Sequence, residues 1–147
     1  MRGKTYDELS VGDKAAFSKT VTEADIHSFS AITADFNPIH TDEVYAAGSS
    51  LGKKVGGRIV QGMLSASLFS TLVGMYLPGK GSLYVSQTCH FKRPVKIGDT
   101  LRAECEVLEK REKGRLLMQT RCLNQHGEVV VEGEAVVSAA RKVEDVI

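Results

Sequence analysis

The feature that most constrains the fold is an uncharged, apolar segment at residues 59–77, IVQGMLSASLFSTLVGMYL. Pro78 and Gly79 follow it and form a normal helix stop signal. Its length is close to the roughly 20 residues of a membrane span. However, it contains Gln61, Thr71, three serines and two glycines, and no aromatic or basic belt brackets it. We therefore favour a buried core helix, which is also apolar nearly all round.

Four segments after this helix alternate apolar and polar residues, as half-buried antiparallel strands do. They cover residues 82–95, 100–112, 115–125 and 128–142. The sequences EKG (112–114) and NQHG (124–127) predict hairpin turns, and RPVKIGD (93–99) predicts a longer break. A further strand is predicted at 14–21, after a turn at 10–14.

One apolar helix followed by antiparallel strands predicts an α+β fold. A curved antiparallel sheet wrapped around a long central hydrophobic helix is the hot-dog fold. The 147 residues fit one domain, so we expect a single domain over residues 1–147. Such a sheet leaves an edge strand exposed, and pairing two edges across a dimer would protect it.

The composition argues against several classes of protein. The chain has 19 Lys and Arg against 18 Asp and Glu, which gives no basic footprint for nucleic acid. The three cysteines, Cys89, Cys105 and Cys122, lack CxxC spacing and are expected to be reduced thiols. The histidines lack metal-ligand spacing, so no metal site is predicted. The polar N-terminus lacks the apolar core of a signal peptide, which predicts a cytoplasmic protein with no membrane segment.

An amphipathic helix is predicted to begin after Thr22 and to end near Thr33. Thr22 is a suitable N-cap, and acids follow it in the first turn, where the helix dipole favours them. Ile26, Phe29 and Ile32 recur at helical spacing, so their face is expected to pack inward.

A second short helix, TDEVYAA, is expected with Thr41 as its N-cap. The next stretch, GSSLGKKVGGR at 48–58, contains four glycines and is predicted to be a mobile, solvated loop. It resembles the phosphate-binding pattern GxxxxGK[ST] only superficially. Its first spacing is one residue short, and Lys54 stands where Ser or Thr is required.

Residues 35–40, DFNPIH, combine turn formers with a carboxylate and an imidazole. Asn37 and Pro38 are good loop formers and are interpreted as scaffolding. Asp35 could cap a turn, and His40 could be a helix-capping or partly buried histidine. Together they could also hold one water, with one group acting as base and the other orienting it. A following helix N-terminus would aim unpaired N–H groups at a developing oxyanion.

The element DFNPIH, the VQGM that opens the apolar helix, and LPGKGSLYVSQTCHFKRPVKIGDTL together resemble one family. They are similar to the MaoC-like (R)-specific enoyl-CoA hydratases of the short, single hot-dog type, from about residue 10 to residue 137. The resemblance implies a hydro-lyase of fatty acid metabolism. It would catalyse reversible syn addition of water to trans-2-enoyl-CoA, giving (R)-3-hydroxyacyl-CoA.

The resemblance also implies roles for individual residues. Asp35 and His40 match the catalytic pair, and the backbone N–H of Gly62 matches the oxyanion donor. Ser70 matches a serine that often faces the pocket, although a structural role is equally open. No cofactor is implied, because CoA is part of the substrate, and the expected assembly is a homodimer or a dimer-based oligomer.

Two positions depart from the family pattern. Gln61 stands where a histidine is usual, just before the oxyanion glycine, and we expect altered tuning without loss of activity. Ala34 stands where many members have glycine.

Three cations near the expected substrate entrance could contact the phosphates of CoA. They are Lys53, Lys54 and Arg58. Arg and Lys are the usual phosphate partners, and we hypothesise that at least one of the three has this role. The alternative is a solvated loop whose lysines only aid solubility.

Two other functions remain open from the sequence. One is a dehydratase of 3-hydroxyacyl thioesters on a carrier protein, and the other is a non-catalytic module that binds acyl-CoA. Binding alone requires neither Asp35 nor His40, which argues against the module. A hot-dog thioesterase would not account for the Asn-Pro-His element.

Overall fold

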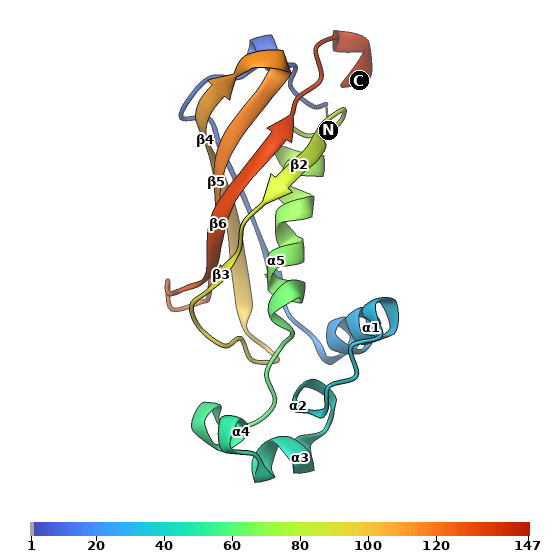
Figure 1. The fold of residues 1–147 in the computed structure, drawn as a ribbon, viewed down its shortest axis with the longest axis vertical. Helices are drawn as coiled ribbons and strands as arrows, with labels where there is room; N and C mark the ends of the chain where they lie inside the picture. Colours follow the sequence, from blue (N-terminus) through green and yellow to red (C-terminus); the bar gives the residue numbers. More distant parts are fainter. Residues whose placement is uncertain (1) are drawn as a thin grey trace.

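The computed structural model describes residues 2–147 and consists of one curved antiparallel sheet wrapped around a helix (Figure 1). The strands are β1 (Lys14–Thr20), β2 (Leu83–Gln87), β3 (His90–Phe91), β4 (Thr100–Arg111), β5 (Arg115–Leu123) and β6 (Val129–Ser138). Their order across the sheet is β1-β4-β5-β6-β2, and β3 also pairs with β6. This is the α+β hot-dog architecture that the sequence predicts.

Five α-helices accompany the sheet in the part of the chain described. They are α1 (Glu23–Thr33), α2 (Pro38–Thr41), α3 (Glu43–Gly48), α4 (Ser50–Val55) and α5 (Gly62–Thr71). Short 3-10 turns lie at Tyr6–Glu8 (η1), Glu112–Gly114 (η3) and Val143–Asp145 (η4). Helix α5 lies against the sheet, while α1 to α4 gather beyond one end of it, near the N-terminus of α5 (Figure 1).

Helix α5 is the predicted core helix, and it continues as a π-helical turn, η2 (Leu72–Tyr76). Its buried side includes Leu64, Leu68 and Phe69, which belong to the main hydrophobic core. Burying each such side chain contributes roughly 1.5–3 kcal/mol. The expectation of a helix buried nearly all round is wrong for one side, where Met63 is exposed. No helix within residues 2–147 has the length and apolar character needed to cross a membrane.

The predicted strand over residues 82–95 is interrupted, which corrects the expectation of a single strand. β2 ends at Gln87, and β3 is only two residues long. Between them the Thr88 carbonyl lies so close to Gly133 on β6 that a Cβ there would clash with it. Only glycine permits this approach, so the break depends on a backbone contact across the sheet. The two predicted hairpin turns are confirmed, since β4, β5 and β6 pair in sequence.

Two local expectations for the helices are wrong. Ile32 is 83% exposed, although Ser30 in the same last turn of α1 is buried. Ile32 lies about 120° around the helix from Ile26, so it is outside the buried face. The N-cap of α3 is Asp42, whose carboxylate accepts the Tyr45 N–H at 2.9 Å, while Thr41 ends α2.

Residues 48–58 are not a loop throughout, because they contain α4. The Ser49 hydroxyl caps this helix by accepting the Gly52 N–H at 2.9 Å. Gly52 also packs directly against the Ala46 carbonyl, where a Cβ would clash. Gly56, with φ of +80°, ends the helix in the left-handed conformation.

Candidate active site

Helix α1 directly precedes the predicted site residues in the chain. Its N-terminus has the expected N-cap, Thr22, and the structure adds a capping box in which Thr22 and Asp25 satisfy each other's backbone amides. Its C-cap, Ala34, has φ of +60° and ψ of +22°, which turns the chain sharply out of the helix. This left-handed conformation is the physical reason why glycine suits position 34.

Asp35 uses its two carboxylate oxygens differently. Oδ1 accepts the Asn37 N–H at 3.2 Å and so shapes the turn. Asn37 in turn accepts the Ile39 N–H through its own Oδ1 at 3.3 Å, and Pro38 is the first residue of α2. The second carboxylate oxygen of Asp35, Oδ2, lies 3.8 Å from Nε2 of His40.

The protonation pattern of His40 follows from its hydrogen bond. Its Nδ1 lies 2.8 Å from the Ile59 carbonyl oxygen, which can only accept. Nδ1 therefore carries the hydrogen, and Nε2 of the neutral ring is an acceptor. The His40 side chain is 11% exposed, whereas that of Asp35 is partly open to solvent. A separation of 3.8 Å is too long for a direct hydrogen bond, but both atoms can contact the same water.

The N-terminus of α5 lies close by in the chain, three residues after Ile59. Leu64 and Ser65 donate their N–H groups back to the Gln61 carbonyl, at 3.0 and 3.4 Å. The Gly62 N–H has no hydrogen-bond partner among residues 2–147. A free amide at a helix N-terminus suits a developing oxyanion.

An apolar cavity of about 370 Å³ lies between α5 and β2, and we call it the α5–β2 cavity. It begins beside Gly62, at Met63, and Ser70 lies on its wall. Its lining consists of Phe29, Met63, Ala66, Ser67, Phe69, Ser70, Tyr84, Val85, Ser86, Gln87 and Cys89. An acyl chain is the kind of group that such a cavity accommodates.

Comparison with known proteins identifies the family of this chain. A family model for the MaoC like domain matches residues 9–141. The (R)-specific enoyl-CoA hydratase of Aeromonas caviae is 47% identical over 130 residues, covering 88% of this chain and 94% of that protein. The chain belongs to the MaoC-like dehydratase family.

Two further relatives support the assignment to this MaoC-like family. The (R)-specific enoyl-CoA hydratase of Rhodospirillum rubrum is 41% identical, covering 90% of this chain and 89% of that protein. A solved structure of an (R)-hydratase from Pseudomonas aeruginosa, in its unliganded form, superposes with a TM-score of 0.89. Its sequence is 44% identical, and the match covers 96% of this chain and 88% of that chain.

Gln61, which departs from the usual MaoC-like pattern, is 2% exposed and links α5 to α1. Its Nε2 donates to the Ser30 hydroxyl at 2.9 Å and lies 3.4 Å from the Ile26 carbonyl. Both acceptors are on the helix that leads to Asp35. Sequence reasoning did not find Ser30, because its partner is 31 residues away and no local pattern marks it.

The three cations proposed for phosphate binding have different surroundings in this MaoC-like chain. Arg58 is bound to Glu23 at 2.6 Å and to Glu43 at 3.0 Å, and it donates to the His40 carbonyl at 3.2 Å. The hydrogen bond from Arg58 lowers the pKa of Glu23, and the pKa of Arg58 is raised in return. Arg58 thus fastens α1, α2 and α3 together. Lys53 and Lys54 are exposed on α4 and form no ion pair with any residue in 2–147.

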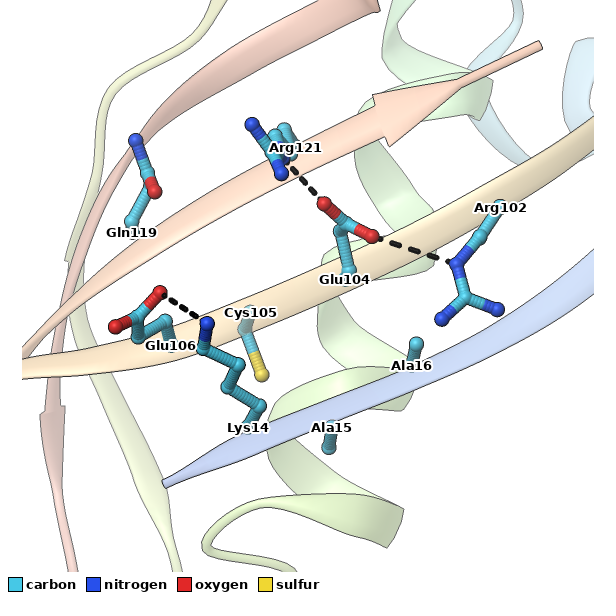
Figure 2. Close-up of a pocket in the computed structure, with 9 residues that line it drawn as sticks. All are labelled: Lys14, Ala15, Ala16, Arg102, Glu104, Cys105, Glu106, Gln119 and Arg121. Carbon is cyan, nitrogen blue, oxygen red and sulfur yellow. Dashed lines mark hydrogen bonds and ion pairs between the residues drawn. The ribbon is translucent and has the colours of Figure 1, made fainter. Parts of the chain in front are cut away.

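A different pocket, of about 350 Å³, lies on strands β1, β4 and β5, away from the candidate site (Figure 2). Its charged side chains pair with one another: Glu104 bonds to both Arg102 and Arg121, and Lys14 lies 3.3 Å from Glu106. Its two carboxylates offset two of its three positive charges, and it contains none of the predicted site residues.

The cysteines are unpaired thiols within the described chain. Burial raises the pKa of Cys105 to about 11 and that of Cys122 to about 12. Neither thiol is therefore a nucleophile near neutral pH. No group of three or more His, Cys, Asp or Glu within residues 2–147 could hold a metal ion.

Proposed function

We propose that this protein is an (R)-specific enoyl-CoA hydratase, a hydro-lyase that adds water to trans-2-enoyl-CoA. The observation that carries the proposal is the placement of Asp35 Oδ2 and His40 Nε2 3.8 Å apart, with His40 Nδ1 held by the Ile59 carbonyl. The unpartnered Gly62 N–H and the apolar α5–β2 cavity supply the other requirements, an oxyanion donor and room for the acyl chain.

The reaction follows from this geometry. One water donates its two hydrogens, one to His40 Nε2 and one to Asp35 Oδ2. As Nε2 takes a proton, the water oxygen bonds to C3 and the C2–C3 double bond becomes a thioester enolate. The Gly62 N–H stabilises the enolate oxygen, and the protonated Nε2 then returns the proton to C2. Because the same group removes and returns the proton, hydroxyl and hydrogen arrive on one face of the double bond.

We propose that no cofactor takes part; adding water causes no net oxidation or reduction, so no redox group is required. CoA is then part of the substrate. Asp35 has two tasks, because Oδ1 holds the turn while Oδ2 orients the water and stabilises the imidazolium.

The deciding experiment is to incubate the protein with crotonyl-CoA and longer enoyl-CoAs and to follow the loss of enoyl absorbance. Chiral analysis of the product should give (R)-3-hydroxyacyl-CoA. An (S) product, or no turnover with any chain length, would contradict the proposal.

We also infer that the active form is a homodimer joined along β2. This strand pairs with β6 on one side only, and apolar side chains of the edge, including Leu83, Val85 and Phe91, are exposed. Pairing β2 with a second copy would satisfy the free backbone groups and bury these side chains. Light scattering at micromolar concentration should give twice the mass of one chain, and a fully active monomer would refute the inference.

Lys53 and Lys54 are the cations that we propose for the phosphates of CoA. Arg58 is occupied by two carboxylates, whereas these two lysines are free to bind a ligand anion. Lys96 lies close to Gly56, at the end of the same helix, and adds a third positive charge.

A further inference from the structure

Gly133 opens a gap on the inner face of the sheet. Its neighbours two positions away on β6, Val131 and Ala135, are fully buried, and Gly133 shares their face because side chains alternate along a strand. The Thr88 carbonyl occupies the space that a Cβ at Gly133 would take. Since β6 lies between β2 and β5, the missing side chain lets a residue of β2 reach across to β5 (Figure 1).

The side chain of Gln87, the last residue of β2, makes this crossing. Its Nε2 donates to Thr120 Oγ1 at 2.9 Å and to the Thr88 carbonyl at 2.8 Å. Thr120 lies on β5 directly opposite Gly133, is fully buried, and donates its own hydroxyl hydrogen to the Gly133 carbonyl at 3.2 Å. Gln87 Oε1 accepts the Tyr84 hydroxyl at 3.3 Å. We call the hydrogen-bonded side chains of Tyr84, Gln87 and Thr120 the Gln87 relay.

Every donor in the Gln87 relay has a fixed direction. The two backbone carbonyls can only accept, so one hydrogen of Nε2 points at Thr88 and the hydroxyl hydrogen of Thr120 points at Gly133. The other hydrogen of Nε2 goes to Thr120 Oγ1. Gln87 Oε1 also only accepts, so the Tyr84 hydroxyl is the donor. The relay therefore uses both amide hydrogens of Gln87 and the hydroxyl hydrogen of Tyr84.

Tyr84 and Gln87 also form part of the wall of the apolar α5–β2 cavity, and we call this part the deep wall. It lies away from the oxyanion donor. Phe91 marks the Gly62 end, since a Cβ at position 62 would lie 3.0 Å from carbon atoms of its ring. Gln87 precedes Phe91 by four residues, and an extended chain advances about 3.3 Å per residue, so Gln87 lies on the order of 10 Å from that end.

We propose that Gln87 is a specificity-determining residue that lets the cavity accept enoyl chains longer than crotonyl; this inference rests on the proposed hydratase function. The relay keeps the polar hydrogens of the deep wall paired, so a long acyl chain meets carbon atoms there. An unpaired amide or hydroxyl hydrogen would lose its water when a long chain covered it, which weakens binding. Crotonyl has one carbon beyond C3 and does not reach the deep wall, whereas decenoyl has seven.

The test compares trans-2-decenoyl-CoA with crotonyl-CoA in variants that break single bonds of the relay. Thr120→Val has nearly the same shape and leaves one amide hydrogen of Gln87 unpaired, and Gln87→Leu leaves the Tyr84 hydroxyl unpaired. Each should lower the ratio of kcat/KM for decenoyl-CoA to that for crotonyl-CoA about 10-fold. Thr120→Ser keeps the hydroxyl and should restore the wild-type ratio. A ratio that stays at the wild-type value in both variants would overturn the proposal.

A second substitution should reverse the effect of the first. Tyr84→Phe combined with Gln87→Leu leaves no polar hydrogen on the deep wall, and the Thr120 hydroxyl still has the Gly133 carbonyl as its acceptor. The ratio should return to within about 3-fold of wild type, because replacing both partners of a hydrogen bond by apolar groups is nearly neutral. A residue that only stabilises the fold would not show this recovery, so a double variant no better than Gln87→Leu would contradict the proposal. Gln119→Leu, exposed on the opposite face of β5, is the matched control.

Binding measurements separate this inference from the proposed function. If wild-type protein hydrates no thioester, the proposed function fails, while calorimetry with decanoyl-CoA and butyryl-CoA still tests the cavity. Decanoyl-CoA should bind wild type at least about 10-fold more tightly than butyryl-CoA, and Thr120→Val should remove most of that difference. Wild type that turns over crotonyl-CoA but not decenoyl-CoA, or that binds both saturated thioesters equally, would overturn the inference alone. If Thr120→Val does not fold, Gln87→Leu and its combination with Tyr84→Phe provide the same test.

Discussion

His40 donates its Nδ1–H to the carbonyl oxygen of Ile59 over 2.8 Å, and this bond links the two halves of the candidate site. It fixes the tautomer that leaves Nε2 facing Asp35. It also ties α2 to the segment that enters α5 three residues later, at Gly62. The base and the oxyanion donor are thus positioned by one short connection.

This geometry predicts severe losses from changes in the water-binding pair. Asp35→Asn and His40→Ala should each lower kcat at least about 100-fold, the usual scale for general acid–base groups. Asp7→Asn and His126→Ala are matched controls, because both residues are exposed and lie outside the site. Circular dichroism should show intact folds. Near-wild-type turnover in either site variant would remove that residue from the mechanism.

The link between Gln61 and Ser30 predicts a coupled effect on catalysis. Gln61→Leu and Ser30→Ala each break a buried hydrogen bond, which typically costs about 1–3 kcal/mol of stability. Because the bond holds α1 against the start of α5, kcat should fall more than KM rises. Ser28→Ala, exposed on the same helix, is the control. A double-mutant cycle should give a coupling of at least about 0.5 kcal/mol, and strict additivity would mean that the bond has no such role.

Local signals in the sequence predicted several of the structural elements that surround this candidate site. Thr22 caps α1, the Asn-Pro turn follows the helix, and Gly62 opens α5. Each of these features is encoded by a few neighbouring residues. The long-range contacts could not be predicted from the sequence. Gln61 bonds to Ser30, and Arg58 bonds to Glu23, across more than 30 residues in each case. Such pairs depend on how helices pack, which no local pattern encodes.

The errors in the secondary structure predicted from the sequence have the same origin. Period-two alternation identified the strands but not the break at Thr88, which depends on Gly133 in another strand. The glycines of residues 48–58 suggested mobility, whereas Gly52 is needed where α4 approaches the Ala46 carbonyl. Ile32 is two i+3 steps from Ile26, and these steps add up to about 120° around α1, which takes Ile32 off the buried face.

Ala34 predicts a pair of opposite stability effects. Its φ of +60° strains a side chain by about 1 kcal/mol or more, so Ala34→Gly should stabilise the fold by up to about 1 kcal/mol. Ala31→Gly, on the exposed surface of α1, should instead destabilise it by about 0.5–1 kcal/mol. Urea unfolding measures both. The same sign for both substitutions would show that the left-handed conformation carries no strain.

The Arg58–Glu23 pair predicts a pH-dependent contribution to stability. Arg58 lowers the pKa of Glu23 below its ordinary value of 4.5, so the folded state binds this proton less readily than the unfolded state. The pair therefore stabilises the fold above about pH 4.5, and the contribution is lost as pH falls through the lowered pKa. Because Glu23 is half exposed, the effect should stay below about 1 kcal/mol.

The variant Arg58→Gln measures the pH-dependent contribution of the Arg58–Glu23 pair to stability. The difference in unfolding free energy between wild type and Arg58→Gln should be larger at pH 7 than at pH 3. A remainder should persist at pH 3, because the hydrogen bond to the His40 carbonyl needs no carboxylate. A difference that is constant across this range would contradict the predicted role of Glu23.

The last prediction follows from the different surroundings of Arg58, which is ion-paired, and of Lys53 and Lys54, which are not. Lys53→Ser combined with Lys54→Ser should raise KM for enoyl-CoA with little change in kcat, the pattern of lost uniform binding. Added salt should weaken wild-type binding more than binding by the double variant, because screening acts on the contacts removed. Arg58→Gln should instead lower stability and kcat, because it loosens the helices around His40. Lys142→Ser, on the exposed C-terminal segment, controls for the general loss of positive charge. If the double variant keeps both its KM and its salt dependence, the phosphates of CoA bind elsewhere.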